Sequence, residues 1–435
     1  MSIKAKSVVL SIVLAGLGQM YNRQWIKGLL FLAIGLTGLY LFFFELYDYL
    51  TGLITLGEQP SGFAKVGKLT RMVEGDHSIF LMVKGLVALL AALLLIGFYA
   101  LNIRDAYKVG AAKEQGKVPL TFQQSMKSIG NKHFAYIVLL IPLIAISFLT
   151  ILPLIFSILL AFTNYADPIL PPAHLLDWVA FTNFWKMFTM NIWSNTFIGV
   201  LKWTIIWAVF ATITTYIGGI LVASLIHQKG LRFKKFWRTA LIIPFAIPNM
   251  VSLLVMRNMF NNQFGPINGY LQFFGLKGLP WLTDPFWAKV TVILVNMWMG
   301  IPITMILAFG VLTTIPRDLY EAAEVDGSGS FQKFRFITLP MVLFATAPIL
   351  IMQFAGNINN FNVIYLLTNG EPLNVNYQFA GHTDLLVTWL YKLALNQSQF
   401  SFASVIGILI FIIVASFSIW SYTRTRSYKE EDMIQ

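Results

Sequence analysis

Residues 321–340 read EAAEVDGSGSFQKFRFITLP, a polar segment between two long apolar runs. Pro316 stands just before it, where the fixed φ of proline suits the first turn of a helix. Asp318 and Glu321 fall in the early turns, where the positive end of the helix dipole favours acidic side chains. Gly327 can adopt the left-handed conformation that ends a helix. The segment therefore predicts a short helix followed by a turn.

One face of this predicted helix carries small side chains. Leu319, Ala322 and Ala323 share that face at i, i+3 and i+4 spacing. Small side chains on an exposed face let the surface of another protein come close. The alternative interpretation is an ordinary loop between two membrane helices.

The composition is that of an integral membrane protein. The 435 residues are 57% hydrophobic and 11% charged, whereas a soluble globular protein carries about 25% charged residues. The absence of cysteine excludes disulfides, thiolate metal sites and thiol nucleophiles. The net charge of +12 fits either a nucleic-acid partner or the excess of Lys and Arg that membrane proteins keep on their cytoplasmic side.

Eight apolar stretches are candidates to cross a bilayer, which needs about 20 largely apolar residues. They are residues 28–44, 79–102, 135–163, 197–226, 238–260, 286–312, 341–366 and 402–422. A shorter run at 8–17 is interpreted as uncleaved and too short to span, either an interfacial helix or half of a hairpin. The sequence thus predicts an all-α, polytopic membrane protein with about eight transmembrane helices. Two lie in an N-terminal region, 1–134, and six in a core domain, 135–435.

The positions of the basic residues decide between the two explanations of the net charge. If the N-terminus is cytoplasmic, 21 of the 31 Lys and Arg residues fall in cytoplasmic segments, as the positive-inside rule requires. Four more lie near the outer ends of spans, where long side chains can reach the interface; they are Lys84, Lys202, Arg257 and Lys289. This orientation makes both termini and residues 313–340 cytoplasmic. Membrane topology therefore explains the charge without nucleic acid.

Two segments are predicted outside the membrane. Residues 164–195 contain several prolines and aromatic residues and are interpreted as a loop or short surface helices. Residues 368–400 form the second, with Trp389 and Tyr391 as predicted interfacial anchors.

Amide side chains gather in the seventh predicted span. The five are Gln353, Asn357, Asn359, Asn360 and Asn362. Asparagines can join helices by hydrogen bonds, so packing is one interpretation. Polar side chains in a span otherwise face a cavity. Amides bond sugar hydroxyls, and the rings of Phe361 and Tyr365 can cover the apolar face of a sugar, so a sugar site is the other interpretation.

Two other spans carry residues that distort helices. In the fifth, Pro244 and Pro248 flank Phe245 and precede Asn249, which predicts a kink. In the sixth, Gly300-Ile301-Pro302 either loosens the helix or permits close packing.

No chemistry of its own is expected from this chain. There is no Gly-x4-Gly-Lys-Ser/Thr phosphate loop, so the chain is not expected to hydrolyse ATP. The five histidines show no metal-ligand spacing, and neither a catalytic residue nor a bound cofactor is expected. A secondary transporter driven by an ion gradient is the alternative. Such carriers need ionisable groups deep in the membrane, whereas the charged residues of these spans sit at their ends.

The polar segment resembles the EAA loop of bacterial ABC importer permeases, with Glu-Ala-Ala, three residues, Gly, nine residues and Ile-x-Leu-Pro. The resemblance implies a type I ABC importer permease fold in which residues 313–340 dock on a cytoplasmic ATPase. The implied coupling residues are Glu321, Ala322, Ala323, Asp326, Gly327, Leu339 and Pro340. It also implies a bacterial inner-membrane location and four kinds of partner: membrane lipid, a second, smaller permease subunit, two ATPase subunits that bind ATP and Mg²⁺, and an extracytoplasmic sugar-binding protein.

Residues 135–422 are most similar to the larger permease subunit of maltose and maltodextrin importers. The similarity rests on Asn-Met-Trp-Met-Gly at 296–300, Asn-Asn-Phe at 359–361 and Leu-Leu-Thr-Asn-Gly at 366–370. It implies a sugar site midway through the membrane, lined by Phe245, Asn249, Asn296, Met299, Gly300, Ile303, Gln353, Gly356, Asn357 and Asn360. Ile303 and Gly356 lack the ring that a maltose site can use there. The expected function is the import of a sugar, maltose or maltodextrin, coupled to ATP hydrolysis by the partner subunits.

Overall fold

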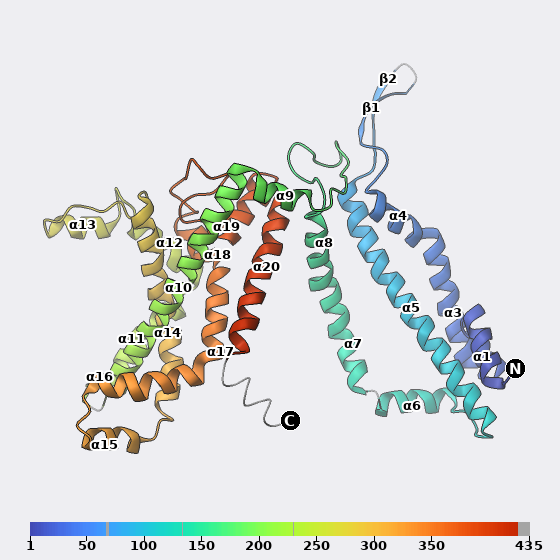
Figure 1. Cartoon of the computed structure of the whole chain (residues 1–435). Helices are drawn as coiled ribbons and strands as arrows, with labels where there is room; N and C mark the ends of the chain where they lie inside the picture. The colour runs from blue at the N-terminus through green and yellow to red at the C-terminus, as the bar shows by residue number, and fades with distance from the viewer. Residues whose placement is uncertain (67–68, 133, 229, 425–435) are drawn as a thin grey trace. The chain divides into compact units, whose positions relative to one another are not determined.

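A computed structural model describes residues 1–66, 69–132, 134–228 and 230–424 (Figure 1). Helices dominate this part of the chain, and its one sheet is an antiparallel hairpin of β1 (Gly62–Val66) and β2 (Leu69–Val73). The chain divides into two compact units, Met1–Ala180 and Phe181–Gln435. The functional division at residues 134 and 135 stays a prediction.

Seven helical segments in the described ranges are long and apolar enough to cross a membrane. They are Trp25–Thr55, Ser78–Glu114, Phe134–Leu160, Asn191–His227, Pro285–Leu312, Ser330–Leu367 and Phe400–Tyr422. A bent pair, α11 (Lys234–Ala246) and α12 (Asn249–Met259), supplies an eighth if it counts as one span. The two helices of the pair meet at 93°, at Ile247-Pro248. The predicted kink is confirmed as a complete break, because Pro248 cannot donate a helical hydrogen bond.

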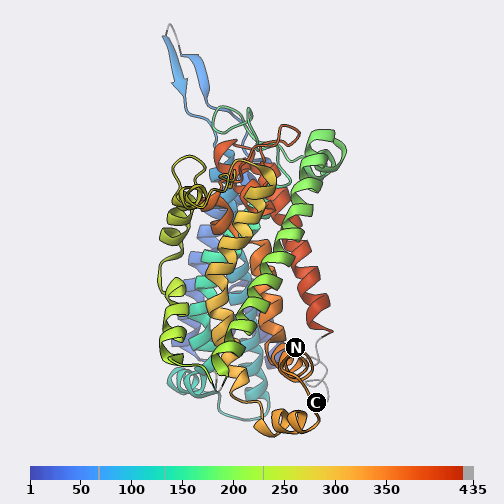
Figure 2. The same cartoon turned by 90° about the vertical axis from the view of Figure 1, so that its left-hand side faces the viewer.

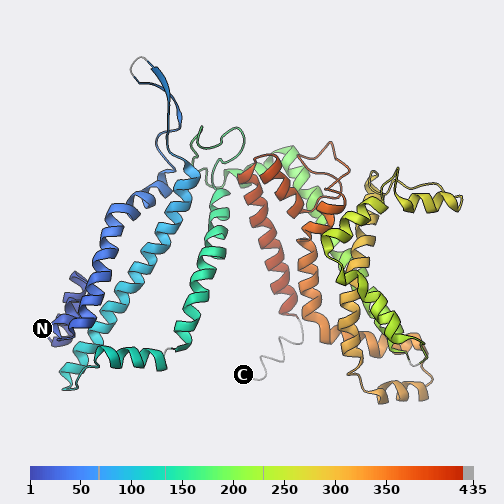
Figure 3. The ribbon, with the colours of Figure 1, turned by 180° about the vertical axis from the view of Figure 1, so that it is seen from behind.

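The N-terminal unit is built along α5 (Ser78–Glu114), against which α1 (Ile3–Val13), α4 (Tyr47–Thr55) and α8 (Leu152–Leu160) pack. The span Trp25–Thr55 comprises α3 (Trp25–Leu41), a π-helical turn and α4, and Phe134–Leu160 comprises α7 (Phe134–Ile146), a second π-helical turn and α8. Figure 3 shows the β1–β2 hairpin beyond one end of α5, and α6 (Phe122–Lys132) running across the other end.

The apolar run at 8–17 belongs to a helical hairpin of α1 and α2 (Leu17–Tyr21), so one of the two interpretations open from the sequence is confirmed. Buried polar contacts tie this hairpin to α5. The Asn102 amide donates to Ser11 O (3.1 Å), and its Oδ1 accepts from the Gly16 amide (3.1 Å). Gln19 Nε2 donates to Asn102 O (3.0 Å). The contacts fix the hairpin because an unmade hydrogen bond in this buried place is costly.

The second unit is organised by α10 (Asn191–His227), which packs along α14 (Pro285–Leu312) and α17 (Leu339–Ile358). A Cβ on Gly300 would lie 2.5 Å from Thr215 Cγ2, so a larger residue cannot be accommodated there without movement. The Gly300-Ile301-Pro302 stretch remains helical within α14. Close packing, the second of the two interpretations of this stretch, is the one that the structure supports.

Figure 2 shows which short helices lie at each end of the long helices of this unit. The short helix α15 (Arg317–Val325) lies beyond the end where α10 and α20 (Phe400–Tyr422) finish. At the opposite end lie α13 (Pro266–Phe273), α9 (Thr182–Thr189), α18 (Phe361–Leu367) and α19 (Leu386–Tyr391). The helix α9 confirms a short surface helix within 164–195.

The segment between α18 and α20 is well packed. Trp389 is fully buried, and its indole nitrogen donates to Gln378 O (2.8 Å). The prediction that Trp389 is an interfacial anchor is therefore wrong, because its ring is part of the fold of this segment. Tyr391 is half-buried in a cluster of rings with Phe361 and Tyr365.

Candidate functional site

The predicted helix of the polar segment is present as α15, with Pro316 just before it and Gly327 after it. Gly327 has φ +76°, in the left-handed region. Its amide donates to Glu324 O (3.0 Å), and the Ser328 amide donates to Ala323 O (2.8 Å). These two bonds form the Schellman motif that ends a helix at a left-handed glycine. The helix and its stop signal are thus confirmed, while the coupling role stays a prediction.

Two contacts hold α15 to the next helical segment, Ser330–Leu367. The Tyr320 hydroxyl bonds Thr338 Oγ1 (2.9 Å), and Lys333 Nζ lies 2.8 Å from Glu324 Oε1. The remaining predicted coupling residues at the start of α17, Leu339 and Pro340, continue from a π-helical turn, Phe334–Thr338. The two contacts therefore connect α15 to the helical segment that continues into α17.

The other faces of α15 are open. Glu321, Ala322 and Asp326 are exposed, and Ala323 is half-buried. Four apolar side chains of α15 and the following turns are also exposed; they are Leu319, Val325, Phe331 and Phe336, of which Val325 is 89% exposed. A group of apolar side chains that a single chain leaves uncovered is typical of a protein contact surface.

Three of the predicted sugar-site amides come together at the far end of α17. The Asn357 amide donates to Thr212 Oγ1 on α10 (2.9 Å). The Asn360 amide donates to Asn296 Oδ1 on α14 (3.3 Å) and to Asn357 Oδ1 (3.5 Å). The Asn296 amide in turn donates to Thr215 Oγ1 on α10 (3.4 Å). We call Asn296, Asn357 and Asn360 the asparagine network.

The network joins four helices, because Asn360 also caps α18 by accepting from the Val363 amide (3.3 Å). Trp207 on α10 donates to Asn357 O (3.0 Å). Asn357 and Asn296 are 7% and 8% exposed. The hydrogen bonds confirm the packing interpretation, because the amides join helices to one another. The sugar site stays a prediction.

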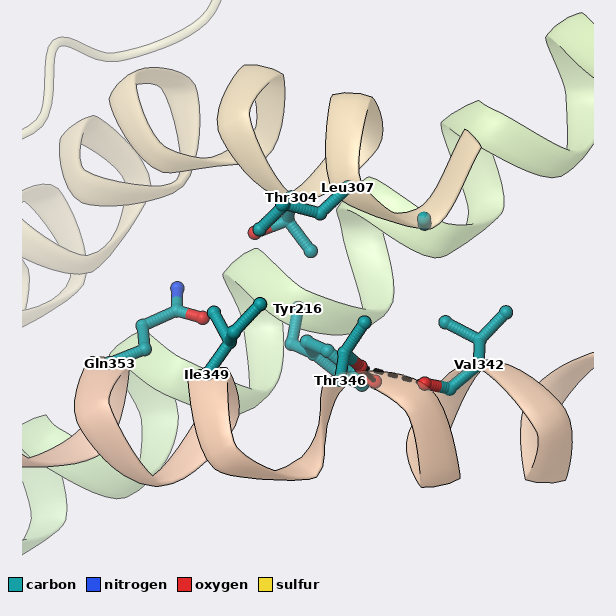
Figure 4. Close-up of a pocket in the computed structure, with 8 residues that line it drawn as sticks. Tyr216, Thr304, Leu307, Val342, Thr346, Ile349 and Gln353 are labelled. Carbon is teal, nitrogen blue, oxygen red and sulfur yellow. Dashed lines mark hydrogen bonds between the residues drawn. The ribbon is translucent and has the colours of Figure 1, made fainter. Parts of the chain in front are cut away.

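A small cavity of about 10 Å³ lies one to four turns along α17 from the network (Figure 4). Figure 4 shows Gln353, Ile349 and Thr346 on α17 directed toward Thr304 and Leu307 on α14, with Tyr216 of α10 beside them. The Tyr216 hydroxyl and Thr346 Oγ1 are 2.5 Å apart. This volume holds about one water molecule, so the helices are closed around Gln353 in this structure.

The other predicted lining residues lie outside the network. Met299 packs against the buried cluster that includes Trp207. Phe245 is 55% exposed at the end of α11, and Asn249 is exposed at the start of α12. Ile303 is 43% exposed, and a Cβ on Gly356 would meet nothing within 4 Å.

Sequence reasoning missed the partners of the network. Thr212, Thr215 and Trp207 precede Asn357 by 142 to 150 residues, so no local spacing relates them. Tyr391, which meets Phe361 and Tyr365, was predicted only as a membrane anchor. Within the described ranges, no group of three or more His, Asp or Glu residues could hold a metal ion.

Comparison with known proteins is consistent with this arrangement. Residues 215–426 match the family model "Binding-protein-dependent transport system inner membrane component". The galactooligosaccharides transport system permease of Bacillus subtilis is 41% identical over 98% of this chain and 98% of its own length. The maltodextrin transport system permease of the same organism is 38% identical over 99% and 98%.

A solved structure shares the fold. It is the crystal structure of a bacterial ABC transporter involved in the import of the acidic polysaccharide alginate, with TM-score 0.55 and 22% identity, over 69% of this chain and 98% of that chain. The sequence relatives cover almost the whole chain at identities well above those that occur between unrelated proteins. The chain belongs to the family of binding-protein-dependent transport system inner membrane components, as a multi-pass permease of the sugar ABC importer type.

Proposed function

We propose that this chain moves a neutral oligosaccharide inward across the membrane, driven by ATP that partner subunits hydrolyse. The observation that carries the proposal is that one helical segment, Ser330–Leu367, interrupted at Asn359 and Asn360, extends from the contacts with α15 to the asparagine network. Its first turns hold α15 through Thr338 and Lys333. Its far part carries Gln353 and Asn357, and its last turns follow Asn360.

This geometry supplies a direct mechanical route. Closure of an ATPase dimer against α15 would displace the base of α17, and α17 would carry that movement to the asparagine network. The network hydrogen bonds are 2.9 to 3.5 Å long, and each is worth only about 0.5–1.5 kcal/mol. Amides held this weakly can exchange an internal partner for a sugar hydroxyl when the helices move. In this proposal the closed cavity at Gln353 opens during the same movement.

The chemistry of the network fits an uncharged ligand. Its side chains are amides and their partners on α10 are hydroxyls, so the group has both donors and acceptors and no net charge. Maltodextrins are the substrate predicted from the sequence, and a maltodextrin permease at 38% identity supports them. Galacto-oligosaccharides are the second candidate, because a galactooligosaccharide permease is 41% identical over the full chain. Neither Ile303 nor Gly356 supplies a ring that would favour maltose.

The proposed partners follow from the same route. The exposed apolar face of α15 suits a cleft on an ATPase subunit, and a second permease subunit would complete a pathway that one chain cannot enclose. An extracytoplasmic binding protein would deliver the sugar at the end where α18 and α19 lie (Figure 2). Both termini are proposed to be cytoplasmic.

The test is ATPase activity and uptake by the reconstituted complex, with its binding protein, against maltose, longer maltodextrins, galacto-oligosaccharides, raffinose and glycerol phosphate. Stimulation by maltodextrins supports the full proposal, and stimulation by galacto-oligosaccharides keeps the importer and replaces the sugar. Uptake by this chain alone, driven by an ion gradient, would contradict the proposal in favour of a secondary transporter.

A further inference from the structure

The helix α18 has two different faces. Val363, Ile364 and Leu367 are buried in the core cluster formed with α10, α12 and α14. At 100° per residue, Phe361 and Tyr365 lie on the opposite side. Asn362 lies beside them, one turn before Tyr365, and is exposed. The second face is therefore one that the described fold of this unit leaves open.

Three aromatic rings form a compact group on this open face. The rings of Phe361 and Tyr365 are stacked, with centroids 4.8 Å apart and planes 20° from parallel. Tyr391, at the end of α19, lies 4.9 Å from Phe361 and 5.0 Å from Tyr365. The three rings come from two helices that are joined by a folded segment, so their mutual positions are fixed by the core beneath them. We call Phe361, Tyr365 and Tyr391 the aromatic group.

Free amides flank the aromatic group. The side chains of Asn359 and Asn362 are exposed, and neither makes a hydrogen bond to any residue that the structure describes. This distinguishes them from Asn357 and Asn360, whose amides are held in the network. Exposed amides beside tyrosine hydroxyls do not suit a surface that faces hydrocarbon, because unsatisfied polar groups there cost several kcal/mol.

Neither of the two helices that supply the rings contains a charged side chain. The charged residue that follows Tyr391, Lys392, is turned inward, where it pairs with buried Asp384 (2.7 Å). Rings that offer an apolar face, amides that offer donors and acceptors, and an absence of net charge are the features that recognise a pyranose ring.

We propose that Phe361, Asn362, Tyr365 and Tyr391 form a second sugar subsite at the outer end of the pathway, next to the asparagine network. The proposal rests on the proposed function. Asn360 belongs to the network and Phe361 to the aromatic group, so the two sites adjoin. A disaccharide occupies the network alone, whereas a longer oligosaccharide extends onto the aromatic group. The subsite therefore determines which chain lengths the importer accepts.

The experiment compares uptake of a disaccharide and of a hexasaccharide of the same series by the full complex in proteoliposomes, with saturating binding protein. Asn362→Leu removes an exposed amide. Because this side chain forms no hydrogen bond to any residue that the structure describes, folding should be preserved. Tyr391→Leu is the second variant. In each variant we expect the ratio of hexasaccharide uptake to disaccharide uptake to fall about tenfold, because one or two hydrogen bonds to the ligand are lost. Disaccharide uptake itself should stay within about twofold of wild type.

Phe264→Leu is the matched control, because Phe264 is an 88% exposed ring elsewhere in the same unit; it should leave the ratio unchanged. An equal loss for both sugars, or loss of the second permease subunit on purification, would overturn the subsite and make this face a protein interface. An unchanged ratio would also overturn it. If wild-type complex takes up no oligosaccharide of any length, the proposed function fails, and the subsite with it.

Discussion

The Lys392 ammonium lies 2.7 Å from the Asp384 carboxylate, inside the segment that joins α18 to α20. Asp384 is 0% and Lys392 8% exposed. The carboxylate also accepts from the Gly381 amide (2.7 Å) and from Thr388 Oγ1 (2.8 Å). Both carboxylate oxygens thus accept hydrogen bonds, and a buried ion pair is tolerated when such bonds accompany it. The pair fixes α19, and with it the position of Tyr391.

Removing one member of this pair should destabilise the second unit strongly. Asp384→Leu leaves the buried Lys392 ammonium without a counterion, which typically costs about 3–5 kcal/mol. The double variant Asp384→Leu/Lys392→Met should recover most of that loss, because an apolar pair of similar volume replaces both charges. Thermal unfolding in detergent, followed by tryptophan fluorescence, measures both. A single variant as stable as wild type would show that the pair does not hold this segment.

Substitution by alanine at two glycines of α14 should change the stability of the second unit in opposite directions. At Gly300 the added Cβ would lie 2.5 Å from Thr215 Cγ2, and overpacking of this kind costs about 1–3 kcal/mol. At Gly310 nothing lies within 4 Å, so Gly310→Ala should stabilise by about 0.5–1 kcal/mol through helix propensity. Comparing the midpoints of thermal unfolding tests the close packing of α10 on α14. Equal effects of the two changes would argue against it.

Asn357 and its partner Thr212 allow a distinction between sugar binding and helix packing. Asn357→Leu should reduce sugar uptake at least tenfold without dissociating the complex. Thr212→Val removes only the acceptor of the Asn357 amide (2.9 Å), which should cost about 1–3 kcal/mol of stability and leave uptake within about threefold. The two variants are compared in uptake and in thermal unfolding. Matching losses of uptake would assign Asn357 a packing role alone.

His382 should make the external segment sensitive to acid. Burial, and then the nearby positive charge of Lys289, hold the pKa of His382 below its usual value of about 6.5. Because the folded state binds this proton less tightly than the unfolded chain does, stability should fall as the pH drops below about 6.5. His382→Gln should flatten that part of the curve when thermal unfolding is measured between pH 5 and 8. If the slope of stability against pH is unchanged in His382→Gln, a group other than His382 causes the acid sensitivity.

The fold was largely predictable, because its signals are local. Eight apolar stretches of sufficient length predict spans whatever their neighbours are, and proline at 248 predicts a break without knowledge of what packs there. The stop at Gly327 was predictable for the same reason, since a left-handed glycine ends a helix by bonds to residues three to five positions earlier.

The candidate site was predictable only in part, because its geometry depends on distant residues. The five amides of α17 and α18 look alike in sequence. Tertiary packing separates them: Asn357 meets Thr212 from α10, whereas Asn362 faces outward on α18. Trp389 was mistaken for an anchor because burial by a folded loop leaves no periodic pattern. Sequence therefore identifies the amides, and only the fold assigns them different surroundings.

Gly327 provides the sharpest test of coupling between α15 and ATP hydrolysis. Its positive φ angle is increasingly incompatible with alanine and then with proline, so the two substitutions form a graded series. At φ +76° alanine costs about 1–2 kcal/mol, so Gly327→Ala should fray the end of α15 and lower sugar-stimulated ATPase activity several-fold. Gly327→Pro should abolish it, since proline requires φ near −65° and removes the amide that donates to Glu324 O (3.0 Å). Gly329→Ala is the matched control, because Gly329 has φ −71° and an added Cβ meets nothing closer than 3.8 Å. Reconstituted complexes with the same subunit content are compared.

Full sugar-stimulated ATPase activity in Gly327→Pro would refute the coupling role of α15. A loss of activity in the Gly329→Ala control would mean that any change in this segment is disruptive.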